Sequence, residues 1–493
     1  MTTFKADSMQ LRFFRWLAAA AALTTGGGAF AASVTHHYTV TVDYSLSRMS
    51  VEARFETPVF SVTARSREAG KFLLDLRDCG DDQKIKMRNR RMMLPDHGIT
   101  CLNYTVDLQR AAKENRNSEL LAPGNIIASP VYWLWRPEIQ NGTRLQVEFR
   151  LPQDVQVSVP WQQLDDSNSR YLLGKSPESS HAPAIFGNFD YRELQVPGAV
   201  LRVAIMDGVH EMDNDAIVDW ITATANDVSL AYGRFPNPSP QIVVIAVGDG
   251  RANGRSAVPF GRVIRDGGET VEFFVDQTQP LEALLADWTA THEFSHLMLP
   301  YLDRRQRWIS EGFSQYYQNV LLARSGAYDA LYAWQKLYAG YERGRKSRPE
   351  LSPNEATANR VRDSLMKVYW SGAALALMAD VTLRERSDGE ESLDDVLDKF
   401  QSCCLPSDRV WTGKELFTKF DTLASAPVFM PLYRRYADTA GFPDISDVFE
   451  RLGIAVSDDV VSLLHNAELQ VIRQSITETD TVAAGRRQQI AGY

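Results

Sequence analysis

Two histidines four residues apart, with a glutamate directly after the first, are the residues of this 493-residue chain best suited to catalysis. They are His292, Glu293 and His296, in the pattern H-E-x-x-H. Residues four apart share one face of a helix, so both imidazoles can point to one metal ion. Neutral imidazole is a preferred ligand of Zn²⁺, and Glu293 can flank the metal without binding it. The pattern predicts a hydrolytic zinc site in which Glu293 is the general base.

A third ligand is predicted in the helix that follows. Apolar residues at helical spacing between 309 and 320 indicate this helix, and Gly326 ends it. Glu311 lies near its start, in the segment W-I-S-E-G-F. Two histidines, one glutamate and a water molecule make the open coordination of a catalytic zinc. We therefore expect one catalytic Zn²⁺ held by His292, His296 and Glu311.

These residues resemble those of the gluzincin metallopeptidases, most nearly the glycyl-aminopeptidase-like family and next the alanyl/leucyl aminopeptidases. In those families a W-x-x-E-G-[FL] segment supplies the glutamate ligand, and residues 308–313 are very similar. The resemblance implies a zinc peptidase in which a mixed sheet leads into the H-E-x-x-H helix, as in thermolysin. Fourteen residues, 297–310, separate His296 from Glu311, where these families usually carry a longer insert. A tight connection between the two helices is therefore expected.

The resemblance also implies roles for residues outside the ligand set. Related families carry a Y-x-x-G segment whose tyrosine stabilises the oxyanion, and Tyr369 matches it. A core tyrosine at a helix start is the alternative. The relatives bind the substrate α-ammonium through a glutamate in G-x-M-E-N or G-G-L-E-H, and that motif is absent. Glu269 lies at about the right distance, but a hairpin joining 258–264 to 270–275 explains its segment better.

The helix that carries the two histidines is expected to run from about 279 to 299. Thr278 can cap it, Pro280 suits its first turn, and Pro300 ends it. Residues spaced by four continue one core-facing stripe along it, namely Leu284, Trp288, His292 and His296. An amphipathic helix with two half-buried histidines and no metal is the alternative to a zinc site.

The N-terminus has the features of an export signal. Arg12 and Arg15 precede a short apolar run at 16–23, and Ala29-Phe30-Ala31 is a small-x-small cleavage site. We predict a signal peptide at 1–31 and a periplasmic or secreted mature chain, with an uncleaved signal anchor as the alternative. No transmembrane helix is expected in the mature chain.

The periodicity of the remaining chain predicts an α+β protein. Alternating apolar and polar residues indicate an N-terminal β-sandwich-like domain, and a change of period near residue 200 begins a mixed α/β domain. The divisions are 32–197 for the β domain, 198–390 for the thermolysin-like catalytic domain, 391–475 for a C-terminal helical region, and 476–493 for a loose tail. Helices are expected at 214–233, 328–343, 365–386, 392–400 and 413–424.

Composition and cysteine content narrow the class of protein. Hydrophobic content of 44% and charged content of 23% are those of a globular protein, and the net charge of −9 gives no footprint for nucleic acid. Export permits disulfides, so a Cys79–Cys101 bridge is predicted. Cys403 and Cys404 are adjacent, and neighbouring cysteines rarely bond to each other without strain, so two unpaired thiols are the simpler expectation, although the sequence leaves their pairing open.

The sequence therefore predicts an exported zinc metallopeptidase that acts on a peptide or protein substrate. Aminopeptidase action is one option, and the absent α-ammonium motif weakens it. Alternatives are an endopeptidase or other amide hydrolase, and a non-catalytic envelope protein that keeps the fold for binding. An intact Glu293 argues against the last, since a binding protein has no use for the base. The sequence does not give an oligomeric state.

Overall fold

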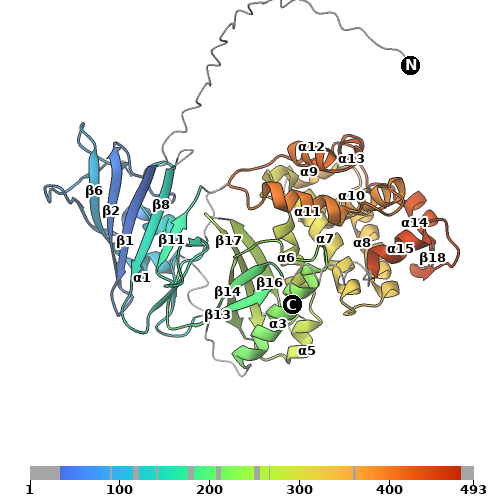
Figure 1. Ribbon diagram of the computed structural model, residues 1–493, viewed down its shortest axis with the longest axis horizontal. Helices are drawn as coiled ribbons and strands as arrows, with labels where there is room; N and C mark the ends of the chain where they lie inside the picture. Colours follow the sequence, from blue (N-terminus) through green and yellow to red (C-terminus); the bar gives the residue numbers. More distant parts are fainter. Residues whose placement is uncertain are drawn as a thin grey trace, which may run out of the picture.

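The computed structural model describes residues 34–88, 91–114, 121–139, 143–175, 182–206, 212–248, 256–265, 267–358 and 362–478. The predicted signal peptide and most of the predicted tail lie outside these ranges. Figure 1 shows a sheet-rich N-terminal part at one end, a helical part at the other, and a smaller sheet between them. The chain is thus a mixed α+β protein with several sheets and many helices, as the periodicity predicts.

A seven-stranded sheet in the order β10-β11-β8-β1-β2-β6-β3 makes up most of the N-terminal part. Buried and exposed side chains alternate along its strands, because successive residues of a strand point to opposite faces. A three-stranded sheet, β7-β12-β9, lies near it, and β4 and β5 form a separate hairpin. The strands are β1 (Val34–Val42), β2 (Arg48–Val59), β3 (Leu73–Asp78), β4 (Met87–Arg88), β5 (Arg91–Met92), β6 (Ile99–Asp107), β7 (Ile126–Ile127), β8 (Thr143–Arg150), β9 (Gln156–Ser158), β10 (Gln162–Gln163), β11 (Arg170–Leu173) and β12 (Ile185–Gly187).

The two N-terminal sheets share one apolar core with two short helices, α1 (Leu108–Lys113) and α2 (Pro130–Trp133). The aromatic segment 131–135 is buried in this core, as the sequence predicts for a dense aromatic cluster. Trp133 lies at its centre and packs edge-on or tilted against Phe149 and Trp161.

A five-stranded sheet in the order β13-β14-β15-β17-β16 lies between the N-terminal part and the helices. Its three inner strands run parallel and its two edge strands antiparallel. The apolar run in β15 is buried throughout, which agrees with a strand covered on both faces. Helix α3 (Asn214–Ser229) packs on one face. The strands are β13 (Asp190–Val196), β14 (Ala199–Met206), β15 (Gln241–Val247), β16 (Phe260–Arg265) and β17 (Glu269–Asp276).

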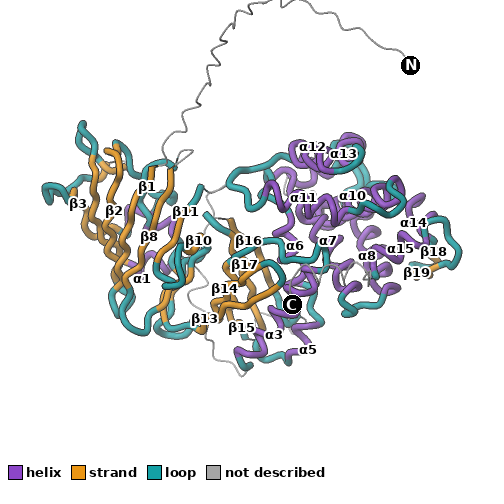
Figure 2. Tube along the Cα trace, viewed as in Figure 1, coloured by secondary structure: helices purple, strands orange, loops and turns teal. Residues whose placement is uncertain are grey.

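Helices dominate the chain after this sheet (Figure 2). Two of these helices begin with a capping box, formed by Ser392 with Asp395 and by Thr412 with Glu415. The helices are α5 (Leu281–Leu285), α6 (Thr289–Ser295), α7 (Arg307–Arg324), α8 (Ala330–Lys346), α9 (Pro353–Ala358), α10 (Leu365–Arg386), α11 (Leu393–Cys404), α12 (Gly413–Leu423), α13 (Phe429–Tyr436), α14 (Ser446–Leu452) and α15 (Gln470–Thr477), and a small hairpin joins β18 (Ile454–Ser457) to β19 (Val460–Leu463).

The prediction of a single helix over 279–299 is wrong. The structure divides it into α5, α6 and a 3₁₀ turn (His296–Met298). Asp287 breaks the helix, because its carboxylate accepts a hydrogen bond from the Thr289 backbone N–H at 2.8 Å and so begins α6 afresh. Thr278 is not the cap of α5, whose N-cap is Pro280. The predicted stripe is also interrupted, since Trp288 is 43% exposed.

Two disulfides join the cysteines. The predicted Cys79–Cys101 bridge is confirmed, with its Cα atoms 5.4 Å apart. Cys403 and Cys404 are also bonded to each other, so the expectation of two unpaired thiols is wrong. Within the described part of the chain, no helix combines the length and hydropathy needed to cross a bilayer.

Candidate metal centre

Helices α6 and α7 bring the three predicted metal ligands together. One carboxylate oxygen of Glu311 lies 3.5 Å from Nε2 of His292 and 3.5 Å from Nε2 of His296. The possible ligand atoms of all three residues lie within 4.8 Å of one another. The two imidazole rings are nearly perpendicular, with centroids 4.9 Å apart. One histidine comes from the middle of α6 and the other from the turn that ends it.

The donor set and its spacing fit a zinc ion. Two ligand atoms that each lie 2.0–2.1 Å from a tetrahedral zinc are about 3.3–3.4 Å apart. The two oxygen-to-nitrogen distances of 3.5 Å are close to that value. Two imidazoles and one carboxylate are also the nitrogen and oxygen ligands that a catalytic zinc takes when one position stays open.

A neighbour from α7 orients one of the histidines. Nδ1 of His296 lies 2.9 Å from Oγ of Ser310, the residue before Glu311. A hydrogen bond to the second ring nitrogen fixes the orientation of a ligand histidine. Gln318, two turns after Glu311 on the same helix, lies near the other histidine, His292, and contributes to raising its pKa. Neither Ser310 nor Gln318 was predicted from the sequence as part of the site, although their spacing from Glu311 along α7 could have indicated both.

Glu311 and His292 shift each other's pKa. Burial alone would raise the pKa of Glu311, but hydrogen bonds from His292 and His296 hold it well below its ordinary range. Burial would lower the pKa of His292, and Glu311 and Glu293 raise it instead. Glu311 is therefore ionised, which is the form that binds a metal.

Glu293 lies beside the ligands in a closely packed position. Burial raises its pKa above the ordinary value, while the two histidines lower it. Strand β16 passes directly over its side chain: a Cβ added to Gly261 would lie 2.6 Å from Cγ of Glu293. Only glycine allows the backbone to approach this closely. The carboxylate is thus held between the edge strand of the sheet and the metal centre.

Tyr369 reaches the site because α7 and α10 cross at close range. A Cβ added to Gly312 would lie 2.3 Å from Cα of Gly372, and one added to Gly372 would lie 2.2 Å from the carbonyl oxygen of Trp308. These glycines follow Glu311 and Tyr369 by one and three residues. The crossing therefore places Tyr369 against the site, with its ring centroid 6.0 Å from that of His292. Burial and the nearby Glu311 raise the pKa of this phenol.

Glu269 is not part of the site. It begins β17, which pairs with β16 as the favoured hairpin reading predicts. Its carboxylate is buried, forms an ion pair with Arg265 at 2.7 Å and accepts a hydrogen bond from Asn237. Arg265 in turn donates to the carbonyl oxygens of His296 and Leu299 at 2.9 and 3.0 Å. This network therefore supports the end of the histidine helix.

The short connection between the ligand helices is tight, as expected, and the C-terminal helices hold it. Leu302 pairs with Trp411 as an isolated bridge. The Asp303 backbone N–H donates to the Trp411 carbonyl at 2.8 Å, and the Trp411 N–H donates to the Tyr301 carbonyl at 2.9 Å. The Gln306 side chain accepts from the Gly413 backbone at 2.7 Å. Residues more than a hundred positions later in the sequence therefore fix the approach of Glu311 to the histidines.

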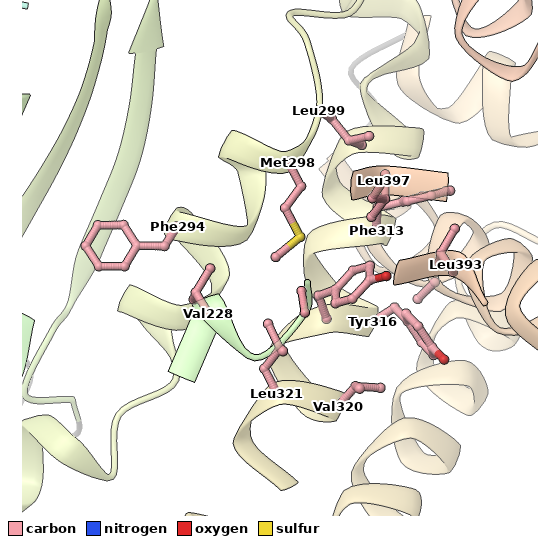
Figure 3. Packing of buried hydrophobic residues seen from close by; sticks show 14 of the residues in the cluster. Val228, Phe294, Met298, Leu299, Phe313, Tyr316, Val320, Leu321, Leu393 and Leu397 are labelled. Atoms are coloured by element: carbon pink, nitrogen blue, oxygen red, sulfur yellow. The ribbon is translucent and has the colours of Figure 1, made fainter. Parts of the chain in front are cut away.

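Buried apolar side chains from α6, α7 and neighbouring helices pack together in one core (Figure 3). Phe294, between the two histidines on α6, points toward the sheet and packs against Phe235 and Phe273. Met298 points the other way, toward α7. Buried side chains on both sides of the short α6 thus determine which face the histidines present.

Comparison with known structures supports the fold. Among the solved structures similar to this chain is the crystal structure of an aminopeptidase N family protein from Idiomarina loihiensis. The two share 14% sequence identity, with a TM-score of 0.54 over 89% of this chain and 78% of the other. No protein-family model and no curated protein matches the sequence. At this identity the likeness shows an aminopeptidase-like fold.

Proposed function

We propose that this chain is an exported zinc metallopeptidase that hydrolyses peptide bonds. One observation carries the proposal: a single Glu311 oxygen lies 3.5 Å from Nε2 of both histidines, with Glu293 buried beside them. His292, His296 and Glu311 would hold the zinc, which when bound polarises the scissile carbonyl and activates water. The likeness to an aminopeptidase N family protein supports a peptidase.

Glu293 is the general base in this proposal. Its carboxylate accepts a proton from the attacking water and passes the proton to the leaving amine. The burial that raises its pKa makes the carboxylate a stronger base than an exposed glutamate. The backbone at Gly261 restricts its side chain, so the accepting oxygen is held in place before substrate binds.

Tyr369 stabilises the oxyanion. Its hydroxyl donates a hydrogen bond to the carbonyl oxygen of the substrate as negative charge develops there. The raised pKa keeps the phenol protonated, which it must be to donate. Its place at the crossing of α7 and α10 fixes the ring beside the ligands.

Endopeptidase action is the second candidate, and the position of Glu269 favours it. An aminopeptidase needs an acidic group to receive the substrate α-ammonium. Glu269 was the acid that the sequence offered, and it is buried in contacts with Arg265 and Asn237. We therefore propose peptide-bond hydrolysis. Cleavage of peptides with free and with blocked N-termini distinguishes an aminopeptidase from an endopeptidase.

Metal analysis of the purified protein, joined to a peptide-library digest, tests the proposal. We expect one zinc per chain, loss of cleavage on chelation, and recovery when zinc is added. Each cleaved peptide is then offered with a free and with an acetylated N-terminus. Equal cleavage of both forms would identify an endopeptidase. Protein that holds no zinc and gains no activity from it would favour the non-catalytic binding protein.

Export rests on the sequence of residues 1–31. Envelope or secreted protein is expected to begin at or near Ala32. Intact-mass measurement of that protein checks the cleavage site, and a mass that includes residues 1–31 would contradict it.

A further inference from the structure

One face of the β4-β5 hairpin carries basic residues and a single methionine. The strands pair with Met87 opposite Met92 and Arg88 opposite Arg91, and the Met93 backbone donates to the Lys86 carbonyl. Because side chains alternate along a strand, two sets form. The inner set, which packs against the N-terminal core, is Ile85, Met87, Met92 and Leu94. The outer set, all exposed, is Lys84, Lys86, Arg88, Arg91 and Met93.

The four cations of this outer face are unpaired within the described part of the chain. No carboxylate among the described residues lies within ion-pair distance of any of them. The nearby Arg77 pairs with Asp75 and Asp82, and Asp75 also interacts electrostatically with Lys84 over a longer distance. The whole protein carries a net charge of −9, so this concentration of positive charge runs against its overall balance. Unpaired cations gathered on one strand face are available to an anionic partner.

The two strands are also tied to the N-terminal part. The Cys79–Cys101 disulfide closes the loop that contains them, and their inner face is anchored in the core. A surface that is already ordered loses little conformational entropy on binding. Large apolar side chains are also exposed here. Met93 is 51% exposed and lies among the cations. Phe60, 67% exposed, lies against Gly98 in the turn that follows the hairpin.

We propose that this outer face docks the protein on the surface of an anionic lipid bilayer. The cations attract anionic headgroups, each contributing about fivefold in affinity near such a surface. Met93 favours a bilayer over a nucleic acid or an acidic protein, because an apolar side chain among cations can enter the interfacial layer. The loop joining β3 to β6 lies at the end of the molecule away from α7 and α10 (Figure 2), so docking leaves the metal centre accessible.

Co-sedimentation with vesicles tests this. The full chain is mixed with phosphatidylcholine vesicles and with vesicles containing about one-third phosphatidylglycerol, at low and at raised salt. We expect preferential binding to the anionic vesicles that weakens as salt screens the charges. The double variant Lys86→Gln/Arg88→Gln should lose about 25-fold of that preference. The charge-matched control Lys346→Gln/Lys414→Gln, in exposed positions on α8 and α12, should bind as wild type does.

A second variant separates a bilayer from other anions. Met93→Ser keeps every charge, so it should weaken binding at each salt concentration without changing the salt dependence. The apolar N-terminal segment is common to all variants, so differences between them report the hairpin. Equal binding to anionic and neutral vesicles, or a double variant that matches the control, would overturn the proposal. Binding to duplex DNA or polyglutamate without a preference for anionic vesicles would assign the face to another class of partner.

Discussion

Glu293 and Glu311 have the same side chain, and their surroundings give them opposite properties. Hydrogen bonds from two imidazoles keep the pKa of Glu311 low, so it is ionised, the form that the proposed ligand role requires. Glu293 lies within the same site, but burial dominates and raises its pKa. Two carboxylates whose environments separate their pKa values are the usual sign of two chemical roles. This contrast motivates substitution of each glutamate in turn.

Glu293→Gln should keep zinc and lose peptidase activity. The amide is nearly isosteric and fits under Gly261, but it cannot accept the proton of the attacking water. We expect a fall in kcat of at least about 10²–10⁴-fold, the usual contribution of a general base. Glu311→Ala should instead weaken zinc retention, because it removes a ligand. Zinc stoichiometry and kcat, measured on both variants, check this; full activity in Glu293→Gln would refute the mechanism.

Tyr369→Phe should lower kcat and leave zinc content and KM nearly unchanged. The ring keeps its packing beside His292, while the lost hydroxyl removes the hydrogen bond to the oxyanion and the interaction with Glu311. Removal of one oxyanion donor costs about 10²–10³-fold in kcat. Steady-state kinetics with zinc analysis measures the effect. If the tyrosine is only a core residue, the variant will differ from wild type in stability and not in kcat.

At the scale of elements, α6 is a seven-residue helix that cannot hold itself in place. Asp287 fixes its start and also accepts hydrogen bonds from Ser256 and Val258. Arg265 supports its end by donating hydrogen bonds to the carbonyl oxygens of His296 and Leu299, in the turn that follows the helix. The positions of both histidines therefore depend on contacts beyond the helix itself.

Arg265→Met should destabilise the protein and weaken zinc binding together. The substitution frees the helix end and leaves Glu269 as a buried carboxylate without its ion pair, which costs about 3–5 kcal/mol. The double variant Arg265→Met/Glu269→Gln removes that buried charge and should recover part of the stability. Denaturant unfolding and zinc titration follow the two effects. Unchanged zinc affinity in Arg265→Met would show that the network does not support the site.

The raised pKa of Asp227, near the end of α3, predicts that the free energy of unfolding depends on pH. Burial raises its pKa to about 6. Because the folded pKa exceeds the unfolded value, folded protein binds the proton more tightly, and stability falls as pH rises from about 4 to 6. Asp227→Asn should therefore be more stable than wild type at pH 8 by about 1–2 kcal/mol, and nearly equal at pH 4. Urea unfolding at both pH values measures the difference; a gain equal at both would refute it.

At the scale of the whole molecule, the N-terminal part and the five-stranded sheet are locked together. The tip of the β16-β17 hairpin packs into the N-terminal part, where Trp161 pairs with Gly268. A Cβ added to Gly268 would lie 1.5 Å from the carbonyl oxygen of Pro160. Buried Arg202 adds a hydrogen bond to the Val159 carbonyl. The strand that covers Glu293 is thus held from its far end by the N-terminal part.

Removal of the Cys79–Cys101 disulfide should destabilise the N-terminal part. The bridge joins positions 22 residues apart, and in the chain-entropy model a loop of this size contributes about 3 kcal/mol. The variant Cys79→Ala/Cys101→Ala should show this loss in denaturant unfolding, and reducing agent should reproduce it in the wild type. Free thiols at both positions in non-reducing peptide mapping of native protein would contradict the bridge.

The sequence by itself determined which residues could form the site and which helices and strands carry them. The i, i+4 spacing of His292 and His296 puts them on one side of α6, and the apolar spacing around Glu311 defines α7. Alternation identified the strands, and the hairpin between β16 and β17 was predictable from its glycines. These features were accessible because each depends on residues within about one helical turn or one strand of each other.

Only the tertiary structure decided how these helices and strands pack against one another. The helix expected over 279–299 breaks because Asp287 also bonds residues 256 and 258, a contact distant in sequence. Gly312 and Gly372 are sixty positions apart, and their contact brings Tyr369 to Glu311. Glu269 could be excluded as a site residue only from its contacts with Arg265 and Asn237 in the folded protein. Such pairings depend on long-range packing, which local sequence patterns do not encode.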